Sequence, residues 1–382
     1  MDSTVNPPIY FNKPCTAGNE LTYIAEAIAS LKISGDGQFT RKCHQFFEQH
    51  FGFQKVLLTT SCTDALEMTA ILANIQSGDE VIAPSYTFVS TVNAFILRGA
   101  RIVFADSYAD NPNMDPSAIE ALITPRTKAI LPVHYAGVAC DMDAIMALAD
   151  KHNLLVIEDA AQAIDSYYKG KPLGNIGQLA AFSFHETKNI IAGEGGMLVM
   201  NDAQYNERAE IIREKGTDRS KFFRGEVDKY GWVDMGSSFL PSDMIAAFLY
   251  AQLEALDTIQ QKRKAIWQHY HTALSPLAEK GVQLPNIPDY ATNNAHMYYL
   301  VCNDANQRIS LIKALKEKNI HAVFHYQSLH QSKFYAPLHN GRPLPHADRF
   351  TDCLLRLPFY NELSPNELDR VCNTILDFYK SI

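Results

Sequence analysis

The stretch Ala181-Phe182-Ser183-Phe184-His185-Glu186-Thr187-Lys188-Asn189 leads from an apolar strand into a short polar turn that carries Lys188. An amine attacks an aldehyde only in its neutral form, and a lysine loses its proton readily when it is partly desolvated. Lys188 therefore has the position of a Schiff-base lysine at a strand end that faces a cleft. A solvated surface charge is the alternative, and it is the commoner state of a lysine.

A second apolar run, Leu154-Leu155-Val156-Ile157, lies upstream and ends in Glu158-Asp159. Such a run is typical of a parallel strand that is covered on both faces. Ligands of open α/β sheets lie beyond the carboxyl ends of the strands, so Asp159 is expected to point at the site of Lys188. A carboxylate there would stabilise the protonated ring nitrogen of pyridoxal phosphate. The other common role of an aspartate at a strand end is a helix N-cap.

A phosphate site is predicted where the strand 55–59 passes through the polar turn 60–63 into a helix over 64–72. Backbone N–H groups and the helix dipole attract an anion at a helix start, and Ser and Thr hydroxyls add donors. An ordinary capped helix is the alternative, since Ser, Thr and Asp are also common cap residues. Ser183 is a further candidate phosphate contact. Phe88 either stacks on the cofactor ring or belongs to the core.

These motifs resemble the DegT/StrS family of sugar-nucleotide aminotransferases, which are pyridoxal phosphate enzymes of fold type I. The resemblance covers essentially the whole chain and rests on Ser61–Leu66, Gly78–Ile82, Pro84–Thr91, Pro132–Gly137, Glu158–Gln162, Phe182–His185 with Lys188-Asn189, and Gly193–Gly196. More narrowly, the stretches 185–189, 213–217 and 236–238 resemble the branch that makes dTDP-4-amino-4,6-dideoxygalactose. That branch supplies an amino sugar for a bacterial surface polysaccharide, enterobacterial common antigen.

The resemblance implies a role for each matching residue. Lys188 would bind the cofactor and then move a proton at the substrate carbon, and Asp159 would pair with the ring nitrogen. Gln162 would lie near the ring hydroxyl and Phe88 would stack on the ring. The residues that would bind the phosphate are Cys62, Thr63 and Ser183, with Ser238 reaching the phosphate of the neighbouring subunit. Cys62 departs from the Gly or Ala of many relatives, and Ser238 and Leu240 from their Asn and Arg.

Three residues are candidates for binding the substrate. Arg219 lies in the stretch 213–229, whose six basic residues are diluted by four acidic ones, and this stretch is either a mobile loop near a diphosphate or a solvated charged loop. His325 and His330 lie in a segment that resembles the substrate-side loop of the family. Core or surface histidines remain the alternative for both.

The alternation of strands and helices predicts an α/β fold with two domains. Residues 1–250 would form a large domain with a mostly parallel central sheet flanked by helices, and 251–382 a smaller C-terminal α+β domain. Strands are expected near 56–59, 80–83, 102–105, 129–134, 154–158, 180–184, 197–200, 297–300 and 322–325. Helices are expected at 64–74, 87–98, 117–123, 142–151, 309–318 and 365–379, with one long, partly interrupted helical region over 242–274.

Composition favours a cytoplasmic enzyme. The chain has 382 residues, of which 47% are hydrophobic, and a net charge of −8, so it has enough apolar residues for a large core but lacks the basic excess that nucleic acids or anionic membranes require. Its seven dispersed cysteines indicate reduced thiols and no zinc site. The first eight residues have neither a basic region nor an apolar core, so no secretion signal is expected.

The resemblance implies a homodimer with active sites at the subunit interface, and a specific reaction. Glutamate would donate its amino group to C4 of dTDP-4-keto-6-deoxy-D-glucose, which gives dTDP-4-amino-4,6-dideoxy-D-galactose and 2-oxoglutarate. The alternatives are another nucleotide, amination at C3, a gluco product, or a non-catalytic sugar-nucleotide sensor. Dehydratases of the family have histidine in place of the reactive lysine, and Lys188 disfavours that reading.

Overall fold

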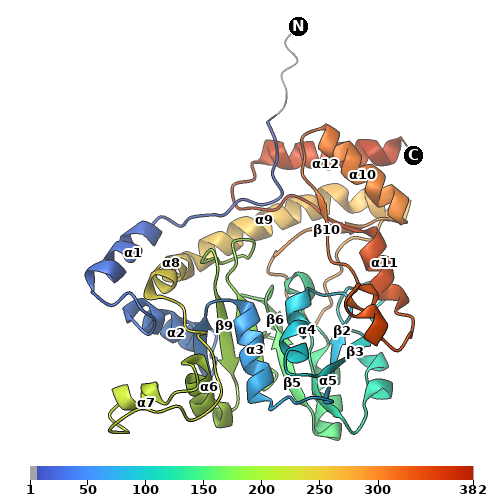
Figure 1. Cartoon of the computed structure of the whole chain (residues 1–382). Coiled ribbons are helices and arrows are strands. Elements are labelled where there is room, and N and C mark those ends of the chain that lie inside the picture. Colours follow the sequence, from blue (N-terminus) through green and yellow to red (C-terminus); the bar gives the residue numbers. More distant parts are fainter. Residues whose placement is uncertain (1–6, 382) are drawn as a thin grey trace.

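The centre of the molecule is a seven-stranded sheet with the strand order β1-β9-β8-β5-β4-β2-β3 (Figure 1). The computed structural model describes residues 7–381, so most of the segment used to predict the absence of a secretion signal lies outside the described residues. β9 runs antiparallel to both its neighbours, and the other six strands are parallel. The strands are β1 (Lys55–Thr59), β2 (Glu80–Pro84), β3 (Arg101–Ala105), β4 (Thr127–Ile130), β5 (Leu155–Asp159), β8 (Leu179–Ser183) and β9 (Gly196–Met200).

Helices cover both faces of this sheet, which explains why its strands are apolar throughout. In β8, Ala181 faces one core and Phe182 faces the other, because successive side chains of a strand alternate between faces. The first core is covered by α3 (Cys62–Leu72), α4 (Val89–Ile96) and α6 (Asn206–Arg213), and the second by α2 (Gln38–His50), α5 (Met142–His152) and α8 (Asp243–Glu254). α1 (Glu20–Ala29) packs against α8. The expected α/β class is confirmed.

One expected helix differs in the structure, and one expected interruption is located. Residues 117–123 form two short 3-10 turns, η1 (Pro116–Ala118) and η2 (Glu120–Leu122), instead of an α-helix. Pro125 disfavours helical backbone at the residue before it, and the chain is already extended at Ile123, so a longer helix has no room to form. The long region over 242–274 is divided at Ala255 into α8 and α9 (Leu256–Leu274).

The C-terminal part has its own sheet and its own core. Its three strands are antiparallel in the order β10-β12-β11, and α9 runs from the large sheet toward it (Figure 1). Its elements are β10 (Tyr299–Val301), α10 (Ala305–Glu317), β11 (Val323–Phe324), α11 (Pro345–Cys353), β12 (Leu354–Arg356) and α12 (Pro365–Lys380). Ile9 also lies in this core and pairs with Ile320. The division of the chain at about residue 250 stays a prediction.

No helix within residues 7–381 is both long and apolar enough to span a bilayer. All seven cysteines are free thiols. In the same described range, no cluster of three or more His, Cys, Asp or Glu side chains is arranged to hold a metal ion.

Candidate active site

The carboxyl ends of β1, β5 and β8 open into a cavity of about 870 Å³. Parallel strands end at the same edge of a sheet, which is where open α/β sheets bind their ligands. Seven of the predicted cofactor residues line this cavity: Cys62, Thr63, Phe88, Asp159, Gln162, Ser183 and Lys188. The C-terminal part closes it with His325, Tyr326 and Arg356 among others.

Asp159 is held rigidly at the end of β5. Its Oδ2 accepts a hydrogen bond from the Thr91 hydroxyl at 2.7 Å, and its Oδ1 accepts one from the backbone N–H of Ala161 at 3.1 Å. No helix begins directly after it among the described residues, so the N-cap alternative does not hold. Burial raises the pKa of Asp159 and outweighs its hydrogen bonds and the charge of Lys188, which act in the other direction. No cation forms an ion pair with the carboxylate within the described structure. A cationic ring nitrogen in the cavity would supply the missing partner.

Lys188 lies in the turn after β8, where its backbone N–H donates to the carbonyl of His185 at 2.9 Å. Its ammonium group makes no hydrogen bond or ion pair with any residue in 7–381, and the side chain lines the cavity. Burial lowers the pKa of Lys188, and the nearby charge of Arg356 acts in the same direction. The lysine is therefore not a solvated surface charge, and its neutral form is accessible at lower pH than usual.

The start of α3 forms an anion cradle. The Ser61 hydroxyl caps the helix by accepting the N–H of Asp64 at 3.1 Å, which leaves the amides of Cys62 and Thr63 without a hydrogen-bond acceptor in the described structure. Gly196 of β9 packs so closely that a Cβ there would lie 2.4 Å from the Cys62 nitrogen. Two free N–H groups at a helix start fit a phosphate, so the cavity suits pyridoxal phosphate at three separate groups of the cofactor.

The remaining predicted cofactor residues are placed as follows. Phe88 is 55% exposed, so it is not a core aromatic, and its ring centroid lies 6.1 Å from that of Tyr326. Gln162 accepts the N–H of Ala136 at 2.6 Å through Oε1 and donates to the Tyr326 hydroxyl at 3.0 Å through Nε2. Ser183 accepts the N–H of His185 at 3.4 Å and lines the cavity.

Three predicted site residues lie away from the cavity of this chain. Arg219 is in the short helix α7 (Arg219–Phe223), where its guanidinium lies 3.9 Å from Glu214. Ser238 is exposed and pairs with Glu214 through a β-bridge. His330 is buried, with Nδ1 2.8 Å from the Ser85 hydroxyl. His325 does line the cavity, and burial holds its pKa well below the usual range.

Most cations of the stretch 213–229 are paired with carboxylates, although Lys215, Arg219, Arg224 and Lys229 are also exposed to solvent. Arg213 is buried and lies 2.7 Å from Asp36. Lys221 pairs with Glu207, and Arg224 with Glu210 and Glu226. None of these side chains lines the cavity.

Among the cavity residues that sequence reasoning missed are three from the C-terminal part, Arg356, Tyr326 and His296. His296 Nδ1 lies 2.8 Å from the Asn189 side-chain oxygen, and burial holds the pKa of His296 well below the usual range. Tyr326 has φ +44, a left-handed conformation that is rare for a residue with a side chain and that often marks a functional site. Neither signal is visible in the sequence.

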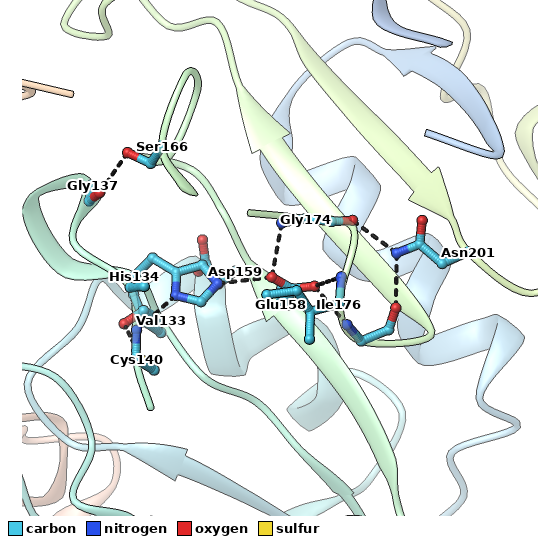
Figure 2. A network of polar contacts seen from close by, with 12 residues as sticks. Val133, His134, Gly137, Cys140, Glu158, Asp159, Ser166, Gly174, Ile176 and Asn201 are labelled. Atoms are coloured by element: carbon cyan, nitrogen blue, oxygen red, sulfur yellow. Dashed lines mark hydrogen bonds and ion pairs between the residues drawn. The ribbon is translucent and has the colours of Figure 1, made fainter. Parts of the chain in front are cut away.

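A buried polar network supports the end of β5 from behind (Figure 2). Glu158 Oε2 accepts from His134 Nε2 at 2.9 Å and from the N–H of Gly174 at 2.8 Å. Its Oε1 accepts the N–H groups of Ile176 and Gly177 at 2.8 and 2.6 Å. The carboxylate thus holds the loop before β8, which leads to Lys188, against the strand that ends in Asp159.

The tautomer of His134 follows from its two contacts. The backbone N–H of Cys140 donates to Nδ1 at 3.2 Å, so Nδ1 is unprotonated and accepts through its lone pair. Nε2 therefore carries the proton and donates a hydrogen bond to Glu158. The backbone N–H of His134 donates to the Asp159 carbonyl at 3.2 Å, and the N–H of Asp159 to the Pro132 carbonyl at 2.9 Å. Both the side chain and the backbone of His134 therefore fix the strand end.

Comparison with known proteins agrees with this site. Residues 14–376 match the model of the DegT/DnrJ/EryC1/StrS aminotransferase family. TlmJ, an aminotransferase from Streptoalloteichus hindustanus, is 28% identical over 98% of this chain and 100% of its own, with a TM-score of 0.90. Spr1654 from Streptococcus pneumoniae, a putative sugar aminotransferase solved in PLP and PMP forms, is 25% identical over 98% and 99%, with a TM-score of 0.90.

A third similar structure is PseC from Helicobacter pylori, an aminotransferase involved in the biosynthesis of pseudoaminic acid. It is 25% identical over 98% of this chain and 100% of its own, with a TM-score of 0.88. The similarity in each case spans nearly the whole of both chains.

Proposed function

This chain belongs to the DegT/DnrJ/EryC1/StrS aminotransferase family, so it is a pyridoxal phosphate-dependent sugar aminotransferase, and we propose the substrates on which it acts. The amino donor is glutamate. The acceptor is dTDP-4-keto-6-deoxy-D-glucose, which is aminated at C4 to dTDP-4-amino-4,6-dideoxy-D-galactose for a surface polysaccharide such as enterobacterial common antigen. The acceptor is proposed from the likeness of the stretches 185–189, 213–217 and 236–238 to that branch of the family.

One observation carries the aminotransferase chemistry: a single cavity holds an unpaired lysine, a buried carboxylate and a helix start with free amides. Bound pyridoxal phosphate would supply an electron sink for the bonds at the substrate carbon. Asp159 would hold its ring nitrogen protonated, the amides of Cys62 and Thr63 would bind its phosphate, and Phe88 would lie against its ring. Ser183 and Gln162 line the same space.

Lys188 would carry the proton transfer. Once its amine is free it lies in the cavity without a competing partner among the described residues, so it can accept a proton from one substrate and return it to the other. Its lowered pKa makes the neutral base available at a lower pH than for an exposed lysine.

We also propose a homodimer in the cytoplasm. Large apolar side chains are exposed on two segments, Ile28, Leu31 and Ile33 on one and Tyr230, Trp232, Val233 and Met235 on the other. Both segments adjoin the stretch 213–216, since Asp36 pairs with Arg213 and Val233 N–H donates to the Gly216 carbonyl. An exposed apolar surface of this extent suits a second copy of the chain. Ser238, beside it, would then contact the cofactor phosphate of the neighbouring subunit.

Visible absorbance of pyridoxal phosphate on the purified protein tests the reaction. Glutamate should abolish the absorbance of the lysine-bound cofactor, and dTDP-4-keto-6-deoxyglucose should restore it. Product analysis by NMR then distinguishes C4 from C3 and galacto from gluco stereochemistry, and a UDP or GDP keto sugar that restores the absorbance faster would replace dTDP. If Lys188→Ala leaves the spectrum unchanged, the lysine assignment fails and the sensor alternative gains support.

A further inference from the structure

Arg356 is a cation in the cavity wall that has no hydrogen-bond or ion-pair partner within residues 7–381. Arg356 is the last residue of β12. Side chains alternate along a strand, so Leu355 packs into the C-terminal core, whereas Leu354 and Arg356 face the large sheet. Its guanidinium makes no hydrogen bond and lies within 4 Å of no carboxylate in the described structure. Its Nε is buried and unsatisfied, and the rest of the side chain lines the cavity.

The surroundings of Arg356 do not compensate its charge. The phenol groups of Tyr135, Tyr326 and Tyr86 are near enough to act on its pKa, and its own charge acts on Lys188, His296 and His325, none of which is an anion that could pair with it. Each phenol group already has a partner, since Tyr86 donates to the His325 carbonyl, Tyr135 lies 2.7 Å from His325 Nδ1 and Tyr326 accepts from Gln162. The one ring beneath the guanidinium is Phe11, at 4.6 Å.

An uncompensated cation in a partly dry cavity favours an anionic ligand. Removing a charge from water is costly unless another charge or several hydrogen bonds replace the hydration, so such a group is expected to be paired when the site is filled. A guanidinium presents a planar fork that matches a carboxylate through two parallel hydrogen bonds. The cavity therefore has a site for a carboxylate in addition to its phosphate cradle at α3.

We propose that Arg356 binds the α-carboxylate of the amino donor. In an α-amino acid this carboxylate is attached to the carbon that carries the amine, so its partner must lie close to the reactive lysine, and Arg356 is close enough for its charge to act on Lys188. A neutral hexose needs no such cation. The diphosphate of a sugar nucleotide is expected nearer the mouth, where Phe88, Val89 and Phe324 are exposed.

The inference rests on the proposed function and makes Arg356 the residue that selects the donor. The same wall of the cavity would then serve a donor with a negatively charged α-carboxylate and an acceptor whose hexose is neutral. The donor uses Arg356, and the acceptor sugar occupies the same place without using its charge.

The test compares glutamate with its α-amide, which keeps the amine and the γ-carboxylate but lacks the α-carboxylate charge. With wild-type protein loaded with pyridoxal phosphate, the second-order rate constant for loss of visible absorbance should favour glutamate by on the order of tenfold to a hundredfold. In Arg356→Gln that ratio should fall to within about threefold, because glutamate slows and the amide does not. Arg356→Lys should give an intermediate ratio, since it keeps the charge and loses the fork.

Calorimetric titration with 2-oxoglutarate of the protein loaded with pyridoxal phosphate, and not treated with glutamate, gives a readout that does not depend on turnover, because 2-oxoglutarate has no amine to transfer. Affinity should fall by a similar factor in Arg356→Gln, while affinity for dTDP stays unchanged. Phe11→Leu is the control for a structural role, because it removes the aromatic contact and keeps the arginine. Thermal melting of every variant checks folding, and Arg356→Lys carries the ratio test if Arg356→Gln does not fold.

Three results would overturn the inference. The first is an unchanged glutamate-to-amide ratio in Arg356→Gln. The second is a loss of dTDP affinity with the ratio retained, which would assign the arginine to the diphosphate, and the third is a Phe11→Leu variant that reproduces the full loss of discrimination. A wild-type protein whose absorbance glutamate does not change would overturn the proposed function, and this inference with it.

Discussion

Glu158→Gln should destabilise the protein far more than its conservative size suggests. The carboxylate is fully buried and accepts four hydrogen bonds, three of them from backbone amides of the loop 174–177 (Figure 2). Glutamine has one accepting oxygen, so its amide N–H₂ must face two of the four donors. His134 cannot relieve this by changing tautomer, because the Cys140 amide already donates to its Nδ1.

The magnitude follows from those donors. A hydrogen bond to a charged group contributes about 1.5 to 3 kcal/mol, and a buried donor left unsatisfied costs a similar amount. Two lost contacts give about 3 to 5 kcal/mol, in the range for breaking a buried charged network. With a urea m-value of about 3 kcal/mol/M, the unfolding midpoint should fall by roughly 1 M or more.

Urea unfolding of Glu158→Gln, followed by far-UV circular dichroism, measures this shift. Glu120→Gln is the matched control, because Glu120, like Glu158, contacts a histidine, at 3.3 Å from His152, and it pairs in addition with Lys151 at 2.5 Å, but it is half exposed. Exposed pairs are screened by water, so no resolvable shift is expected for the control. Equal midpoints for the two variants would refute the reasoning.

The pH dependence provides a second check. Burial opposes ionisation of Glu158, but the hydrogen bonds from His134 and from the backbone amides outweigh it and hold the pKa of Glu158 below 4.5. Stability that comes from a lowered carboxyl pKa is present above the unfolded-state value and is lost as pH falls through the folded value. The difference in midpoint between wild type and Glu158→Gln should therefore be constant above about pH 5 and shrink below about pH 4.5.

Three further outcomes are expected. Gly196→Ala would place a Cβ 2.3 Å from the backbone at the start of α3, so affinity for pyridoxal phosphate should fall at least about tenfold in a fluorescence titration. Gly231 has open space around it, so Gly231→Ala should leave this affinity unchanged. The rate at which cofactor-free protein takes up pyridoxal phosphate should rise with pH, and the midpoint of this rise should lie below pH 10.5, because burial lowers the pKa of Lys188 and only the neutral amine reacts. The charge of Asp159 raises this pKa, so Asp159→Asn should lower the midpoint further. Trp232→Glu, at a side chain that is 84% exposed, should convert the expected dimer to monomer in sedimentation velocity, and an unchanged dimer would place the interface elsewhere.

The apolar pattern of the strands, and the polar residues that follow them, were sufficient to predict the centre of the site. Lys188, Asp159 and the start of α3 each follow an apolar strand directly, and the ends of parallel strands meet at one edge of a sheet. The sequence could therefore predict that these groups share a cavity, although they are distant along the chain. The same rules predicted the strands of the large sheet to within a few residues.

Other assignments depended on how surface segments pack, which the pattern does not encode. Arg219 was assigned from the charges of its stretch and Ser238 by resemblance, and in this chain they lie outside the cavity, beside the apolar surface proposed to bind a second copy. His330 lies close in sequence to His325, but a turn directs it to Ser85 instead of the cavity. Only contacts across subunits could restore a role for the first two.

The sequence by itself determined the fold class and the cofactor and predicted the reactive lysine, because strand periodicity and strand-end chemistry are local properties of the chain. The tertiary structure alone decided that Arg356 stands unpaired in the cavity and that Glu158 supports Asp159 from behind. Arg356 ends an ordinary short strand, and its charge becomes significant only when the C-terminal sheet packs against the large one. Burial and the absence of a partner arise from that packing, and the residue types alone do not reveal them.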